Sequence, residues 1–211
     1  MKKIVCLVLA LMLCMTFALA EEVSSKTTKD LTVMTVTGEN IPADSGFFIA
    51  DIQAEESEEY QAVLDICNAE IEKLAALQTS EEAIESYFGE ISNAEGNSVS
   101  LKEMLGLAEG ETVHVSEFLP IVAGNYDVSY GSVTANLVFA TPYAEGEKVA
   151  VLIGIVTTLE DGTTQIVWTV YEGVGVAADN VESAGCIQVD FDAEIIEQIQ
   201  NGTAVMAIAS K

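Results

Sequence analysis

The stretch from Val149 to Tyr171 reads VAVLIGIVTTLEDGTTQIVWTVY and contains the strongest fold signal in the chain. Its first eight residues are apolar on both faces of an extended chain, which is typical of a central, buried strand. Asp161 and Gly162 favour a tight hairpin turn. The return segment alternates between apolar and polar residues, which places Trp168 on a core-facing side. The stretch therefore predicts two long antiparallel strands within a β-rich core.

Further strands are expected on both sides of this hairpin. Residues 133–140 alternate in the same way, residues 187–191 form a short strand, and residues 204–209 form a closing strand. Before the closing strand, Asp192 is placed to cap a short helix with isoleucines on its apolar face. With about seven short strands, residues 113–211 predict an Ig-like antiparallel β-sandwich.

The preceding region, residues 31–112, predicts an α-rich part with a small β-hairpin. Residues 55–78 predict the longest helix, because apolar residues recur there at spacings of three and four. Capping patterns predict a second helix near 81–90 and a short third helix after it. Two strand-like segments are expected to pair as the hairpin, at residues 31–37 and 47–52. The fold class is therefore α+β, with the helical part packed against the sandwich.

Residues 1–20 have the pattern of a secretory signal peptide. Two lysines precede an apolar segment that ends in an A-x-A site, so we expect cleavage after Ala20. A retained membrane anchor and lipid attachment at Cys14 are the alternatives. Residues 21–30 are polar and are expected to be flexible. We therefore expect a protein of the bacterial envelope or extracellular space, with no membrane insertion after cleavage.

The charge balance narrows the possible partners. The 211 residues include 34 Asp and Glu but only 8 Lys and Arg, which gives the chain a net charge of -26. All eight basic residues are lysines, so the chain has no arginine for bidentate recognition of phosphate or carboxylate. Nucleic-acid binding is disfavoured for the same reason. No phosphate-binding or dinucleotide-binding glycine pattern is present, so no cofactor is expected. The expected partner is an unidentified protein or cell-wall component.

Two cysteines, Cys67 and Cys186, follow the predicted leader. An even number of cysteines in a secreted protein invites a disulfide, which here would join the helical part to the β-rich part. The alternative is two buried thiols that act as small apolar side chains. The sequence alone does not decide between them, because it does not report the distance between the two Cα atoms.

The segment Ser183-Ala184-Gly185-Cys186-Ile187 resembles the S-x-G-C-[IV] signature of L,D-transpeptidases, a family of secreted cysteine enzymes of the cell wall. The resemblance implies that Cys186 is a nucleophile. This sequence departs from the family pattern, because Ala184 and Gln188 stand where the family has His and Arg. A thiol nucleophile needs a base or a positive environment, and His114 is the only histidine in the chain. The pair Cys186 and His114 is therefore the candidate catalytic constellation.

Asp190, Asp192 and Glu194 form an acidic alternating run that is a candidate for binding Ca²⁺. The run lacks the glycine and the spacing of an EF-hand loop. The alternative is a set of solvated charges around a helix start, with Asp192 as the cap. We expect no metal site on this second interpretation.

Three hypotheses about function follow from these patterns. The leading one is a secreted, acidic, non-enzymatic binding or interaction protein whose ligand is unknown, because no complete catalytic constellation is present. The alternative is a cysteine-dependent cell-wall enzyme that uses Cys186 with His114. A third is a structural or inhibitory module that acts through its acidic surface.

Overall fold

The computed structural model describes residues 35–37, 46–48, 58–77, 81–124, 126–139, 143–176 and 185–211. The predicted signal peptide, the polar residues 21–30 and the predicted start of the long helix at 55–57 lie outside these ranges. Among the described helices, none combines the length and the apolar character needed to cross a membrane.

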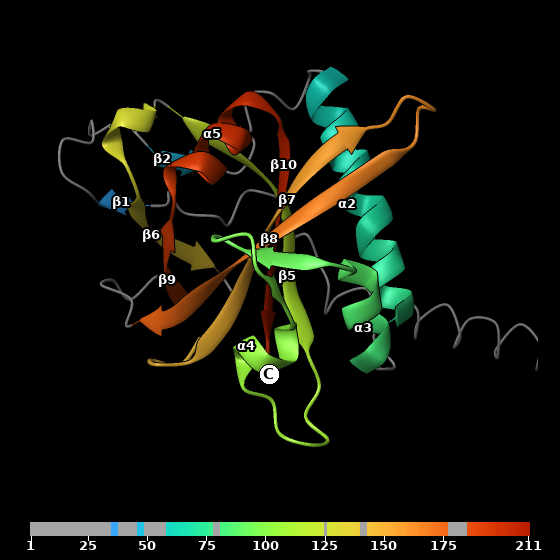
Figure 1. Cartoon of the computed structure of the whole chain (residues 1–211), viewed down its shortest axis with the longest axis vertical. Coiled ribbons are helices and arrows are strands. Elements are labelled where there is room, and N and C mark those ends of the chain that lie inside the picture. The colour runs from blue at the N-terminus through green and yellow to red at the C-terminus, as the bar shows by residue number, and fades with distance from the viewer. Residues whose placement is uncertain are drawn as a thin grey trace, which may run out of the picture.

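The hairpin of β7 (Lys148–Thr158) and β8 (Thr164–Val176) confirms the first prediction. The two strands pair antiparallel along their whole length. At the turn, the Asp161 carboxylate accepts a hydrogen bond from the Thr163 backbone N–H at 2.9 Å, and Gly162 has a φ of 83° that favours glycine. The hairpin extends to the upper right of the molecule in Figure 1.

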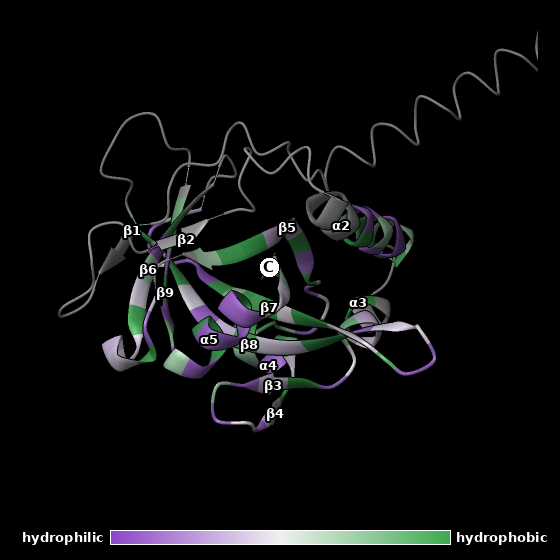
Figure 2. Ribbon diagram, turned by 90° about the horizontal axis from the view of Figure 1, so that it is seen from above, coloured by the Kyte–Doolittle hydropathy of each residue, from purple (hydrophilic) through white to green (hydrophobic). Residues whose placement is uncertain are grey.

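Eight further strands complete the sheet. They are β1 (Thr35–Thr37), β2 (Gly46–Phe48), β3 (Ile91–Asn93), β4 (Ser98–Val99), β5 (His114–Gly124), β6 (Val133–Phe139), β9 (Gly185–Phe191) and β10 (Thr203–Ser210). Eight strands form one continuous path in the order β1-β6-β9-β8-β7-β10-β5-β2, and β3 and β4 branch from β8. The two end strands, β1 and β2, contact each other, so the sheet is rolled up (Figure 2).

The α+β character is confirmed, but the Ig-like sandwich is not. The structure has one rolled sheet, whereas a sandwich has two sheets that face each other. The alternation of apolar and polar residues predicts which side chains of a strand face a core. Because this pattern is the same in a rolled sheet and in a sandwich, it does not distinguish the two arrangements. The predicted small hairpin is wrong, because β1 pairs with β6 and β2 pairs with β5, with no ladder between β1 and β2 in the described residues.

The predicted helices are confirmed as α2 (Glu58–Leu77), α3 (Glu81–Phe88), α4 (Leu101–Leu105) and α5 (Ala193–Asn201). A short 3₁₀ helix, η3 (Val128–Tyr130), follows β5. The α5 helix begins as predicted, since the Asp192 carboxylate accepts a hydrogen bond from the Ile195 backbone N–H at 2.9 Å.

The rolled sheet separates two cores. The inner core lies inside the roll, where residues of β5 to β10 meet three isoleucines of α5. The outer core lies between α2, α3 and α4 and the outer face of β5, β7, β8 and β10. Trp168 belongs to the outer core and packs edge-on against Phe88 and Phe118, with ring centroids 5.1 and 5.9 Å away. The helical part and the sheet therefore share one hydrophobic cluster.

Candidate functional site

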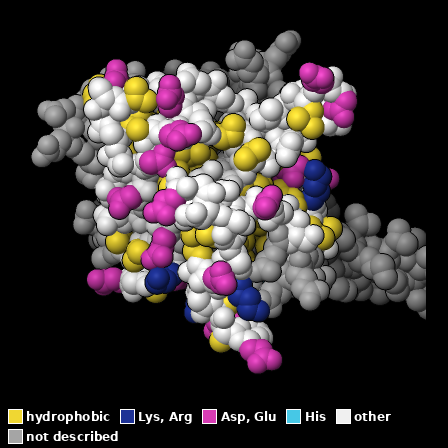
Figure 3. Space-filling view, viewed as in Figure 1, with side chains coloured by type: hydrophobic (Ala, Val, Ile, Leu, Met, Phe, Trp, Pro, Cys, Tyr) yellow, Lys and Arg dark blue, Asp and Glu magenta, His cyan; other side chains and the backbone are white. Residues whose placement is uncertain are grey.

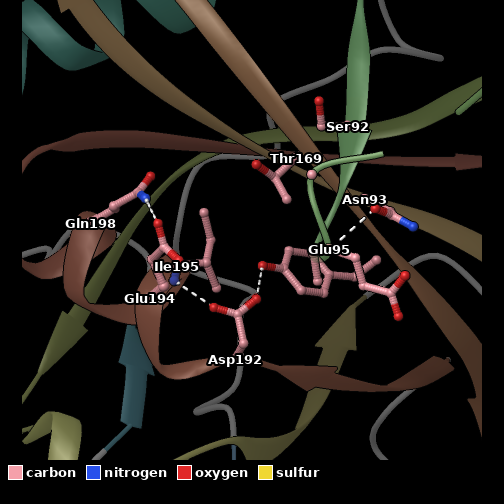
Figure 4. A pocket seen from close by; sticks show the side chains of 11 residues that line it. Ser92, Asn93, Glu95, Thr169, Asp192, Glu194, Ile195 and Gln198 are labelled. Atoms are coloured by element: carbon pink, nitrogen blue, oxygen red, sulfur yellow. Dashed lines mark hydrogen bonds between the residues drawn. The ribbon is translucent and has the colours of Figure 1, made fainter. Parts of the chain in front are cut away.

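A pocket lies where β8 changes its neighbouring strand. On one edge of β8, β3 pairs in parallel with residues 168–170, and β9 pairs antiparallel with residues 173–176. The two registers leave Tyr171 and Glu172 between them. At this fork β3 leaves through a tight turn and β9 leaves into α5, and a pocket of about 280 Å³ opens between them (Figure 4).

Three elements supply the walls and floor of the pocket. The end of β3 and the turn after it contribute residues 92–96, and β8 contributes Thr169 and Tyr171. The cap and first turns of α5 contribute Asp192, Glu194, Ile195 and Gln198. In Figure 4, the α5 side chains and the turn face each other across Thr169. The pocket therefore depends on segments that are about a hundred residues apart in the chain.

The α5 wall is fixed by hydrogen bonds to Asp192. One carboxylate oxygen caps α5, and the other accepts a hydrogen bond from the Tyr171 hydroxyl at 2.6 Å. Burial raises the pKa of Tyr171 well above its usual value, and the hydrogen bond to Asp192 adds to this effect. Tyr171 is only 6% exposed and packs edge-on against Phe191 at 5.0 Å. The first turn of α5 is thereby anchored to β8.

The opposite wall is an Asx turn. The side-chain oxygen of Asn93 accepts hydrogen bonds from the backbone N–H groups of Glu95 and Asn97, at 3.1 and 2.9 Å. Gly96 has a φ of 78°, a conformation that glycine adopts without strain. The Glu95 carboxylate accepts a hydrogen bond from the Asn97 side chain at 3.1 Å. These local bonds fix the turn before any ligand is present.

The pocket is acidic and rich in hydrogen-bonding groups. Three carboxylates line it, from Glu95, Asp192 and Glu194, together with the polar side chains of Thr169 and Gln198. No lysine or histidine is among the lining residues. Such a lining suits hydroxyl, amide and ammonium groups, and it repels anions.

The structure does not bring the candidate catalytic pair together. Cys186 is a buried residue of β9, and His114 is an exposed residue of β5 that lies 3.2 Å from the Thr112 hydroxyl. Three strands, β10, β7 and β8, lie between β5 and β9 in the sheet order. Since neighbouring strands are about 4.8 Å apart, the imidazole is far outside hydrogen-bond reach of the thiol.

Cys67 and Cys186 are both present as buried thiols. Cys67 is a residue of α2 and belongs to the outer core, and Cys186 of β9 pairs with Val138 of β6 and Val176 of β8 in the strand ladders. Burial, with the nearby Glu70 carboxylate, raises the pKa of Cys67 to about 12. At neutral pH this thiol is protonated and is therefore a poor nucleophile.

We expect neither cysteine to react with iodoacetamide in the native protein at pH 7.5 within an hour. In protein that lacks the predicted leader, and with it Cys6 and Cys14, both thiols should react after denaturation without a reductant, which intact mass would show as two added groups. A chain that stays unlabelled after denaturation would contradict this expectation and establish the disulfide between Cys67 and Cys186. Fast native labelling of Cys186 would favour the cysteine-nucleophile hypothesis instead.

The three residues of the candidate Ca²⁺ run have separate contacts. The Asp190 carboxylate accepts a hydrogen bond from the Thr134 hydroxyl at 2.5 Å, Asp192 caps α5, and Glu194 lies 3.5 Å from the Gln198 amide. Within the described part of the chain, no group of three or more His, Cys, Asp or Glu residues is placed to hold a metal ion.

We expect the free energy of unfolding to fall as the pH rises above about 9. In the unfolded chain, cysteine and tyrosine lose their protons near pH 9.0 and pH 10.0, whereas burial raises the pKa of Cys67, Tyr87 and Tyr171 in the folded protein. Above pH 9 the folded state therefore binds more protons than the unfolded state. The stabilisation is complete below pH 9 and is lost as the pH rises further. Urea unfolding between pH 7 and 11 measures this. Tyr87→Phe should reduce the decrease, and an equal decrease in that variant would contradict the assignment.

The sequence identified Asp192 as a helix cap but missed the turn residues of the pocket. No sequence pattern described above singles out residues 93–97, although an asparagine followed by a glycine three residues later is a turn signal. The flanking strands have only three and two residues, too few for an alternation pattern.

No family model, curated protein or solved structure matches this chain, so its function is inferred from the site alone.

Proposed function

We propose that this chain is a non-enzymatic binding protein of the bacterial envelope or extracellular space. Its binding site is the pocket between the turn after β3 and the start of α5. The ligand is a small polar molecule, or the end of a larger one, with hydroxyl, amide or ammonium groups. The proposal extends the sequence-based hypothesis by giving the unidentified protein or cell-wall component a place to bind.

The observation that carries the proposal is that hydrogen bonds within the chain hold both walls of the pocket. Asp192 joins β8 to α5 through two hydrogen bonds, and Asn93 closes the opposite turn. Because these groups are already ordered, a ligand loses little free energy in organising the site. Ligand sites of this kind are usually formed before binding and combine concave shape with a few fixed polar groups.

The arrangement of the cysteines argues against the enzymatic alternative. A cysteine enzyme of the cell wall needs a thiolate with a base at hydrogen-bond distance. Cys186 and His114 lie on strands that are separated by three others, and Cys67 is held protonated in the outer core. The pocket itself is lined by neither a cysteine nor a histidine.

A ligand screen on a pocket-filling variant tests the proposal. The wild-type protein is screened for thermal stabilisation by amino sugars and by soluble fragments of digested cell wall whose net charge is neutral or positive. Gln198→Trp places a bulky side chain at the pocket. Gln200→Trp is the matched control, since Gln200 is also an exposed glutamine of α5 but does not line the pocket.

We expect at least one fragment to stabilise the wild type and Gln200→Trp, and to lose this effect in Gln198→Trp. Mass spectrometry of the fragment after incubation should show an unchanged mass. Equal binding by both tryptophan variants would contradict the location of the site, and conversion of the fragment would contradict the non-enzymatic role.

A further inference from the structure

The β7–β8 hairpin carries exposed apolar and polar side chains on the same face as the pocket. Tyr171 of β8 faces the inner core, so alternation places Thr169, Val167 and Gln165 on this face as well. Val167 is 54% exposed, the largest exposed fraction among the exposed large hydrophobic residues of the described chain. Its cross-strand neighbour on β7 is Ile155, which is only partly buried. Thr157 pairs with Gln165 one step closer to the turn.

These four residues, Ile155, Thr157, Gln165 and Val167, are here named the hairpin strip. The strip continues the floor of the pocket, because Thr169 lines the pocket and Val167 is the next residue on the same face of β8. Side chains on one face of a strand repeat about every 6.4–6.8 Å. In Figure 2 the turn end of the hairpin projects to one side of the molecule, and apolar residues are visible along its strands. The pocket and the strip therefore form one elongated surface.

Acidic side chains lie at both ends of this surface. Glu95 and Glu194 line the pocket at one end, and Glu160 and Asp161 lie in the hairpin turn at the other. In Figure 3 acidic side chains are spread over the face viewed, and lysines are few. Three of the described lysines form ion pairs elsewhere, each with its Nζ atom within 4.0 Å of a carboxylate oxygen. The pairs are Lys73 with Glu70, Lys148 with Glu172, and Lys211 with Glu111.

We propose that the pocket and the hairpin strip together bind an extended, basic peptide segment of a partner protein, with apolar side chains at its centre and cationic side chains toward both of its ends. This inference rests on the proposed function and names the class of its ligand. An extended peptide has the same side-chain repeat as β8, so one of its apolar side chains covers Val167. Lysine or arginine side chains then reach the carboxylates at the two ends of the surface.

Charge complementarity selects this occupant over an acidic or neutral polymer. A neutral glycan leaves the carboxylates unpaired and gains little from Val167. An acidic peptide is repelled by the three carboxylates of the pocket and by the net charge of -26. A basic peptide gains electrostatic attraction that falls as salt is added, which gives the proposal a measurable signature.

Calorimetry with two synthetic octapeptides tests the inference. The probes are a basic octapeptide, Lys-Lys-Val-Thr-Val-Thr-Lys-Lys, and its acidic counterpart with Glu in place of each Lys, each blocked at both ends, titrated into the full chain at 50 and 300 mM NaCl. Val167→Thr replaces one exposed methyl of the strip by a hydroxyl at nearly the same side-chain size, and Val128→Thr is the matched control because Val128 is 51% exposed at η3. The double variant Glu95→Gln/Glu194→Gln is compared with Glu109→Gln/Glu145→Gln, whose carboxylates are exposed outside the pocket.

We expect the basic octapeptide to bind and its acidic counterpart not to bind, with the affinity of the basic one falling about tenfold between the two salt concentrations. Val167→Thr should weaken binding about fivefold and Val128→Thr less than about 1.5-fold. The Glu95/Glu194 variant should weaken binding about tenfold, against about twofold for its control. Gln198→Trp should weaken binding as well.

Equal binding of the two peptides, or equal affinities for a variant and its control, would overturn the inference. If a cell-wall fragment binds the wild type, is blocked by Gln198→Trp, and the basic octapeptide does not bind, the inference fails while the proposed function stands. If the basic octapeptide binds but Gln198→Trp has no effect, the pocket is not part of the peptide site and the inference fails. The proposed function fails separately if fragments bind Gln198→Trp and Gln200→Trp equally.

Discussion

Replacing Trp168 with alanine is expected to lower the free energy of unfolding by about 3–5 kcal/mol, the range for large aromatic residues in cores. Trp168 is 4% exposed and makes edge-on contacts with Phe88 at the end of α3 and with Phe118 on β5. Its ring also lies over Gly154, where an added Cβ would lie 2.7 Å from it. Removal of the indole therefore leaves a cavity between the helical part and the sheet.

Urea unfolding followed by far-UV circular dichroism measures this loss, since the variant has no tryptophan fluorescence. Val167→Ala is the control, because it changes the neighbouring residue of β8 at an exposed position and should cost less than about 1 kcal/mol. A loss below about 1 kcal/mol for Trp168→Ala would mean that Trp168 lies at the surface, as a ligand platform would.

Replacing Asp192 with alanine is expected to cost about 2–4 kcal/mol, the second-largest effect. The change removes the cap of α5, typically worth about 1 kcal/mol, and leaves the hydroxyl of the buried Tyr171 without its acceptor, which costs about 1–3 kcal/mol. The first turn of α5 is also a wall of the pocket, so ligand binding should weaken in the same variant.

Two further variants separate the two roles of Asp192. Asp192→Asn keeps an acceptor oxygen for the cap, and its amide N–H can donate to the Tyr171 hydroxyl oxygen, so it should lose about 1 kcal/mol or less. Tyr171→Phe removes only the hydroxyl, and combined with Asp192→Ala it should cost less than the sum of the single losses, since both changes remove the same hydrogen bond. Additive losses would contradict that bond.

The local elements of this fold could be predicted from the sequence. The β7–β8 hairpin, the Asp192 cap and the long helix each depend on residues within a few turns or strands of one another. Trp168 was expected in a core because it stands on the apolar side of an alternating strand, and it is there.

The arrangement of these elements could not be predicted in the same way. Alternation gives the faces of a strand and is silent about its neighbours, so the single rolled sheet was expected to be a sandwich. The end strands β1 and β2 pair with β6 and β5, and not with each other, because partners distant in sequence leave no local signal. The pocket depends on this same long-range pairing, in particular on the parallel contact of β3 with β8.

The most direct test of the account is a map of amide chemical-shift changes in the ¹⁵N-labelled protein, at saturation with the tightest-binding compound found for it. The account predicts that the largest changes cluster at residues 92–96 of the turn, at Thr169 of β8 and from Glu194 to Gln198 of α5. It also predicts that the compound is recovered unchanged. Shifts centred around Cys186 and His114, or a chemically altered compound, would contradict it.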